Sequence, residues 1–134
     1  MIIYISIGLF ALASVLGIAI LIRWLQRKDA STGVVYSHGV VAVSGLLVLV
    51  VYSIMNPDHF PAISLALFPL AAIAGLYMYF SYEHTRLNSE HRRKKRLVSV
   101  AFLHAFFAIS GVTTLLVFLF TGKLANQVLA LLGI

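Results

Sequence analysis

The sequence predicts an all-α integral membrane protein, a four-helix bundle built from two tandem, parallel-oriented helical hairpins. Composition is the first reason, because 61% of the 134 residues are hydrophobic and only 10% are charged. A water-soluble chain of this length could not bury that much apolar surface in one core. Four long apolar runs and an internal repeat are the other two reasons. We treat residues 1–134 as a single transmembrane domain.

The four runs each approach the ~20 residues that a helix needs to cross a bilayer. Lipid offers no hydrogen-bond partners to the backbone, and runs this long and uniformly apolar favour helices over alternating strands. The first run lacks a basic leader and a convincing cleavage site, which favours a permanent span over a secretory signal. A last apolar segment is too short to span and is expected to be an interfacial tail on the outer face. The predicted spans are residues 2–24, 34–55, 61–82 and 97–121, and the tail is residues 123–134.

The basic residues predict the orientation of these spans. Nine of the ten Lys and Arg residues lie in the connections at 23–28 and 86–96. The positive-inside rule places both connections in the cytoplasm, with the N-terminus, the turn at 56–61 and the C-terminus outside a cell inner membrane. Basic loops beside spans are more typical of topology determinants or anionic-lipid contacts than of nucleic-acid binding. We therefore expect the lipid bilayer, and no nucleic acid, as a partner.

An eight-residue phrase that begins with histidine occurs twice. Residues 38–45 read HGVVAVSG and residues 104–111 read HAFFAISG, an offset of 66. His, Ala and Gly at the first, fifth and eighth positions fall on one helical face in both copies. Each imidazole therefore heads a stripe of small side chains.

A second repeated phrase precedes the first in each half. Residues 9–13 (LFALA) and 67–71 (LFPLA) match at an offset of 58, and each is followed by a glycine. The difference between the two offsets fits a longer second basic connection. Two hairpins of one design and one orientation imply a pseudo-two-fold axis along the membrane normal. Such an axis would place His38 and His104 opposite one another at similar depth.

Two interpretations compete for the repeated histidines. Small residues at this spacing let helices approach closely, and each histidine could then hydrogen-bond across a helix interface. Alternatively, an ionisable residue inside a membrane is a functional candidate by default. Haem iron takes nitrogen ligands from opposite sides, and a porphyrin edge needs small neighbours, which favours haem b with His38 and His104 as metal ligands. Cysteine is absent, which excludes haem thioethers, iron–sulfur clusters and thiolate sites.

Other candidate contacts to the cofactor are the small residues of both phrases and two arginines at the cytoplasmic end. The arginines suit anionic haem propionates, although for either arginine taken alone contact with lipid headgroups is the favoured role. These candidates are Gly39, Ala42, Gly45, Ala105, Ala108, Gly111, Arg23 and Arg96.

A four-span bundle with these two histidine phrases resembles the cytochrome b561 type of membrane cytochrome b. It is also similar to small bacterial four-span proteins with two such hairpins. Cytochromes b561 usually carry two histidine pairs and two haems. Here His59, His84 and His91 lie in loops or at span ends. The resemblance therefore implies at most one b-type haem per chain.

The leading hypothesis is an electron-transfer haem protein, with a quinone or a redox protein as partner and one haem near the cytoplasmic side. Ligation by two histidines fills both axial positions, which disfavours oxygen chemistry at the iron. The first alternative is a non-haem helical assembly or accessory subunit. The second is a small proton-coupled transporter, in which the histidines would relay protons. Whether the chain is an enzyme, a homo-oligomer or a subunit of a larger complex stays open.

Overall fold

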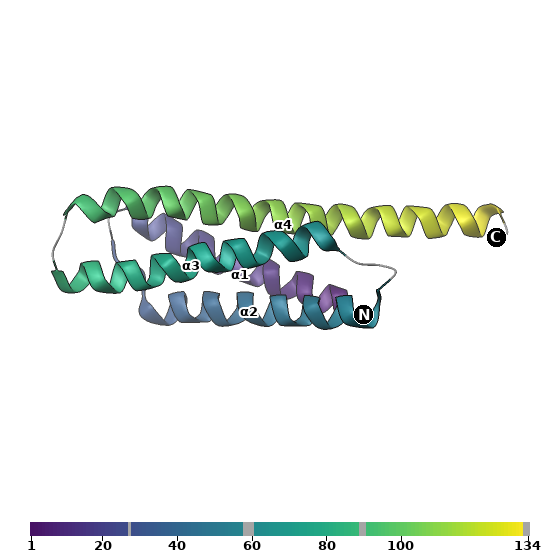
Figure 1. The fold of residues 1–134 in the computed structure, drawn as a ribbon, viewed down its shortest axis with the longest axis horizontal. Helices are drawn as coiled ribbons and strands as arrows, with labels where there is room; N and C mark the ends of the chain where they lie inside the picture. Colours follow the sequence, from purple (N-terminus) through teal and green to yellow (C-terminus); the bar gives the residue numbers. More distant parts are fainter. Residues whose placement is uncertain (27, 58–60, 89–90, 133–134) are drawn as a thin grey trace. The chain divides into compact units, whose positions relative to one another are not determined.

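The structure is a computed structural model in which the described part of the chain is helical. It describes residues 1–26, 28–57, 61–88 and 91–132, with side chains except those of residues 82–98, 123, 125, 126 and 128–130. Within these ranges the helices are α1 (Ile2–Leu25), α2 (Thr32–Met55), α3 (Ala62–Asn88) and α4 (His91–Leu132), as Figure 1 shows. The all-α prediction is confirmed.

Each helix contains a stretch that is long and apolar enough to cross a membrane. These stretches are Ile2–Leu25, Thr32–Met55, Ala62–Ser81 and Ser99–Gly122. They agree with the four predicted spans to within a few residues at each end. The agreement arises because polar or charged residues lie between the apolar stretches and mark their ends in the sequence.

Local hydrogen bonds and prolines explain where α2 ends and where α3 begins. α2 ends where the backbone N–H and the side-chain amide of Asn56 both donate to the Tyr52 carbonyl, at 3.0 and 2.9 Å. Pro57 follows and cannot continue the helix. The carbonyl of Pro61 accepts the first hydrogen bond of α3 from the Leu65 N–H at 3.0 Å. Proline is well tolerated there because its missing N–H would have no helical partner.

α3 and α4 extend beyond the predicted spans. α4 begins at His91, within the basic segment, because Arg and Lys are good helix formers. It also continues without a break to Leu132, so the predicted tail from residue 123 is the last part of α4 rather than a separate helix. No proline interrupts the sequence after Pro69. A loss of hydrophobicity marks where a span ends, but it does not by itself end a helix.

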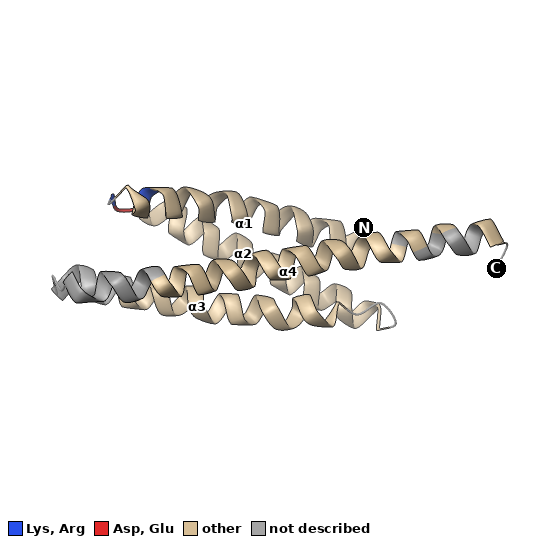
Figure 2. Ribbon diagram, turned by 90° about the horizontal axis from the view of Figure 1, so that it is seen from above, with Lys and Arg blue, Asp and Glu red and all other residues tan. Residues whose placement is uncertain are grey.

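The chain divides into two compact units, Met1–Phe60 and Pro61–Ile134. In the first unit α1 packs against α2, and in the second unit α3 packs against α4. Figure 2 shows that the described charged residues of the first unit gather where α1 is connected to α2. These residues are Arg23, Lys28 and Asp29.

The two units bury equivalent positions. In the first unit, Leu49 of α2 is 0% exposed, and α1 buries Ile3, Ser6, Phe10 and Ala13. In the second unit, Leu115 of α4 is 1% exposed, and α3 buries Ser64, Phe68 and Ala71. The positions correspond at offsets of 58 in α1 and α3 and 66 in α2 and α4. The repeat seen in the sequence is thus a repeat of core packing.

Candidate functional site: two histidine seats

His38 is held by a carbonyl group of the neighbouring helix. It lies on α2, half-buried, with its Nδ1 atom 2.8 Å from the carbonyl oxygen of Ala13 on α1. A carbonyl oxygen can only accept, so Nδ1 carries a proton and donates it. In the neutral ring the lone pair is then on Nε2.

His104 repeats this arrangement in the second unit. It lies half-buried on α4, and its Nδ1 atom is 2.7 Å from the carbonyl oxygen of Ala71 on α3. Ala71 corresponds to Ala13 at the offset of 58. Both histidines therefore donate from the same ring nitrogen to the same position of the partner helix.

A glycine lies against each imidazole. A Cβ atom at Gly17 would lie 3.1 Å from Cε1 of His38, and one at Gly75 would lie 3.2 Å from Cε1 of His104. The rings rest on bare backbone, where any side chain would press against them. We call each set a histidine seat. The first seat comprises Ala13, Gly17 and His38, and the second comprises Ala71, Gly75 and His104.

Sequence reasoning did not assign a role to the alanine and glycine of either seat. Both glycines were seen only as the end of a repeated phrase on α1 and α3. The signal was an Ala followed four residues later by Gly, present twice at the same offset as the rest of that phrase. This signal can be interpreted only when the pairing of the helices is known. The histidine that contacts the glycine lies 21 residues after Gly17 in one unit and 29 residues after Gly75 in the other.

The glycines at the ends of the two histidine phrases pack against the neighbouring helix of the same unit. A Cβ at Gly45 would lie 3.2 Å from the ring of Phe10, and one at Gly111 would lie 2.9 Å from the ring of Phe68. Gly45 also accepts a hydrogen bond from the buried Ser6 hydroxyl through its carbonyl oxygen, at 2.9 Å. Close packing inside each helix pair is thus sufficient reason for glycine at both positions. Their contact with a cofactor stays a prediction.

The remaining small residues of the two phrases lie in more open places. Ala42, Ala105 and Ala108 are half-buried, whereas Gly39 is exposed and a Cβ there would meet nothing within 4 Å. The stripe predicted from the sequence therefore divides: its glycine end packs against phenylalanine, and its histidine end is partly accessible.

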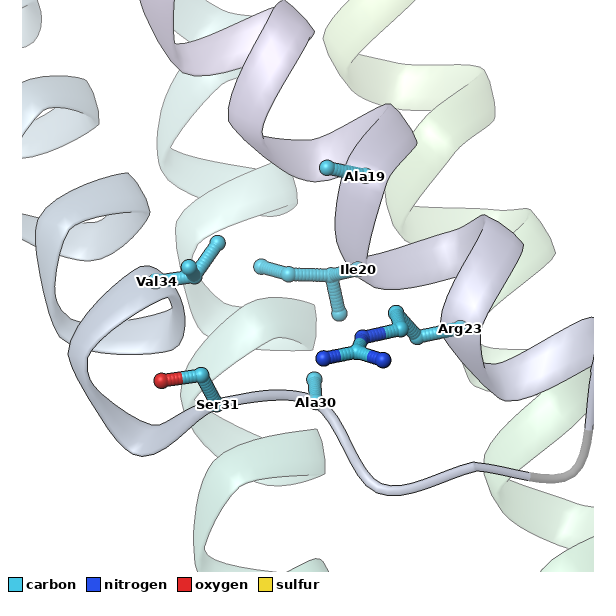
Figure 3. Close-up of a pocket in the computed structure, with 6 residues that line it drawn as sticks. All are labelled: Ala19, Ile20, Arg23, Ala30, Ser31 and Val34. Atoms are coloured by element: carbon cyan, nitrogen blue, oxygen red, sulfur yellow. The ribbon is translucent and has the colours of Figure 1, made fainter.

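Arg23 borders a small hollow where α1 and α2 are connected. The hollow has a volume of about 70 Å³, and Figure 3 shows its lining side chains, Ala19, Ile20, Arg23, Ala30, Ser31 and Val34. Val34 lies one helical turn before His38 on α2. Arg23 itself is exposed, and it shares the lining of the hollow with Val34. The side chain of Arg96, the other predicted arginine, lies outside the described residues.

His38 and His104 belong to different units, and their pairing stays a prediction. Among the residues that the structure describes, no group of three or more His, Cys, Asp or Glu could hold a metal ion. His59 and the side chains of His84 and His91 lie outside the described part.

Comparison with known proteins adds no relative. No protein-family model matches the chain, and neither the curated proteins nor the solved structures contain a significant match.

Proposed function

We propose that the chain is an integral membrane four-helix bundle of two tandem, parallel-oriented hairpins in a cell inner membrane. Four sufficiently long apolar helices support insertion into the bilayer. Nine of ten Lys and Arg in two connections support cytoplasmic placement of those connections, with both termini outside. Lipid-facing surface also accounts for the many exposed large apolar side chains, such as Val15 and Phe106, which are 64% and 63% exposed.

Within that bundle, we propose one b-type haem near the cytoplasmic side, with His38 and His104 as its axial ligands. The observation that carries this proposal is the duplicated hydrogen bond from Nδ1 to a backbone carbonyl. Histidines that ligate metals almost always donate their other ring N–H to a carbonyl or carboxylate, which fixes the tautomer and orients the ring. Both seats meet this requirement and direct the coordinating role to Nε2.

Each part of the chain would contribute to such a site in a different way. The Ala13 and Ala71 carbonyls hold the imidazoles in the ligating tautomer. The partly accessible residues Gly39, Ala42, Ala105 and Ala108 leave room beside the rings. Arg23 and Arg96 would meet the anionic propionates. Bound haem supplies reversible one-electron oxidation and reduction, which suits exchange with a quinone or a redox protein.

A specific observation also favours a second candidate, a non-haem assembly or accessory subunit. The glycine–phenylalanine contacts and the imidazole–carbonyl hydrogen bonds join the two helices of each unit through protein groups alone. Polar contacts between membrane helices of this kind stabilise association by about 0.6 kcal/mol on average. In that case the histidines join helices and need no cofactor.

Absorption spectra separate the two candidates. The protein is expressed with haem supplied, purified in detergent, and measured oxidised and after dithionite reduction. We expect a sharp α band of a six-coordinate b-type haem on reduction. His38→Ala and His104→Ala should each abolish it, because each removes one axial ligand. His59→Ala, which changes a histidine outside the predicted spans, is the matched control and should leave the spectrum unchanged.

Two results would contradict the haem proposal. One is a folded, colourless protein from haem-supplied cells, which would favour the assembly role. The other is an unchanged bis-histidine spectrum in His104→Ala, which would show that His38 and His104 are not the two ligands of one haem.

A further inference from the structure

We propose that Gly17 and Gly75 are positioning residues that impose the Nδ1–H tautomer and the ring orientation of His38 and His104. Nothing in the histidine phrases themselves specifies which nitrogen carries the proton. The free imidazole side chain favours the Nε2–H tautomer. The carbonyl on the neighbouring helix, which lies 2.8 Å from Nδ1 of His38 and 2.7 Å from Nδ1 of His104, favours the opposite tautomer.

The carbonyl group that accepts from each histidine already accepts a backbone hydrogen bond within its own helix. In α1 the Ala13 carbonyl oxygen takes the N–H of Gly17, four residues later, as its regular helical partner. Its second lone pair can still accept, provided that another donor reaches it from the side. The same relation holds between Ala71 and Gly75 in α3.

Glycine opens that side approach. Side chains on a helix lean toward its N-terminus, so a side chain four residues later lies over the turn that carries the carbonyl. At position 17 such a side chain would stand 3.1 Å from Cε1 and 3.4 Å from Nδ1 of His38. At position 75 the corresponding distances to His104 are 3.2 and 3.3 Å. At these distances each ring must move by a few tenths of an ångström to admit a methyl group. We infer that the movement lengthens the hydrogen bond to the carbonyl.

The effect is specific to these two glycines. Gly8 lies on α1 as well, yet a Cβ there would meet nothing within 4 Å. A glycine on α1 is therefore not always in close contact with α2. Both units contain a seat, although the connections between their helices differ in length. The seats therefore do not result from one particular loop or from a chain end.

The tautomer can be measured without haem. Nitrogen-15 spectra of the histidine rings, in ¹⁵N-labelled protein in micelles at the alkaline end of a pH titration, distinguish Nδ1–H from Nε2–H. The signals are assigned by their loss in His38→Gln and His104→Gln. We expect both rings in the Nδ1–H form. Gly17→Ala should move His38 toward the Nε2–H form and leave His104 unchanged, and Gly75→Ala should do the reverse.

Gly8→Ala is the matched control and should leave both rings unchanged. Retention of the Nδ1–H form by His38 in Gly17→Ala, or the Nε2–H form in the wild type, would overturn the proposal. Should the glycine variants fail to fold, the wild type provides its own test. A nuclear Overhauser effect between the Gly17 Hα protons and the His38 Hε1 proton is expected, and its absence would count equally against the seat.

The consequence for metal binding rests on the proposed function. In haem-loaded protein, Gly17→Ala should alter the g-values of the low-spin ferric centre and its midpoint potential, since both respond to ligand orientation and hydrogen bonding. Gly8→Ala should alter neither. Protein without haem but with the expected ring tautomers would refute the cofactor while leaving the seats established.

Discussion

At the scale of single residues, the absence of a side chain matters as much as its presence. Gly17 and Gly75 admit an imidazole, whereas Gly45 and Gly111 admit a phenyl ring. The four positions have the same residue type for two different reasons. Only the ring that occupies the space distinguishes them.

The phenyl-packed glycines lead to a prediction about stability. Replacing a helical glycine by alanine stabilises a helix by about 0.5–1 kcal/mol when space is available. At Gly111 the new methyl would lie 2.9 Å from Phe68, on a ring that is itself 6% exposed. Overpacking of this kind costs about 1–3 kcal/mol and should prevail over the helical gain. Gly111→Ala should thus lower the free energy of unfolding, measured by circular dichroism during denaturation in sodium dodecyl sulfate.

Gly8→Ala provides the comparison, because the added methyl meets nothing and only the helical gain applies. Its unfolding free energy should equal or exceed that of the wild type. A loss of stability in Gly8→Ala as large as that in Gly111→Ala would show that the ring contact is not the cause.

At the scale of the helices, the two units share a plan but differ in how a buried serine is satisfied. On α1 the Ser6 hydroxyl donates to the Gly45 carbonyl of α2. On α3 the equivalent Ser64 instead pairs with the Thr114 hydroxyl of α4 at 2.9 Å. Thr114 in turn lies 2.9 and 3.0 Å from the carbonyls of Ser110 and Gly111 on its own helix. The second unit thus has a side-chain link between helices at this level.

That link can be measured by a double-mutant cycle. Ser64→Ala, Thr114→Val and the double variant should give a coupling of about 0.6 kcal/mol, and no more than about 1.7 kcal/mol, as for other hydrogen bonds between membrane helices. Ser14→Ala is the control, since Ser14 is exposed and donates only to the Phe10 carbonyl of its own helix. Additive effects of Ser64→Ala and Thr114→Val would contradict a direct interaction.

At the scale of the whole molecule, charge and not packing determines the proposed orientation. The chain contains no cysteine, so a single introduced thiol reports its own side of the membrane. In spheroplasts, a membrane-impermeant maleimide should label Pro57→Cys, in the turn after α2. It should label Ser31→Cys, in the first basic connection, only after the membrane is permeabilised. Both positions are exposed, so reactivity is limited by sidedness.

The opposite labelling pattern would invert the topology and would place the histidine seats near the outer face. Equal labelling of both variants in sealed spheroplasts would argue against a spanning arrangement of α2. Neither outcome would alter the geometry within each helix pair.

The sequence by itself determined the helical class, the approximate limits of the four apolar stretches and the existence of a repeat. These are consequences of local composition: apolar runs need helical backbone in lipid, and short polar connections, two of them basic, separate the runs. It also singled out His38 and His104. The helix ends of α3 and α4 were less predictable, because good helix formers continue a helix past the apolar run.

Tertiary structure alone decided what the repeated residues touch. A periodic pattern places His38, Ala42 and Gly45 on one face but does not reveal that Gly45 meets Phe10, or that the imidazole reaches the Ala13 carbonyl. Those contacts depend on the register between two helices, which is set by packing over the whole pair. For the same reason the role of Gly17 and Gly75 emerged only when the histidine of the next helix was seen to lie against them.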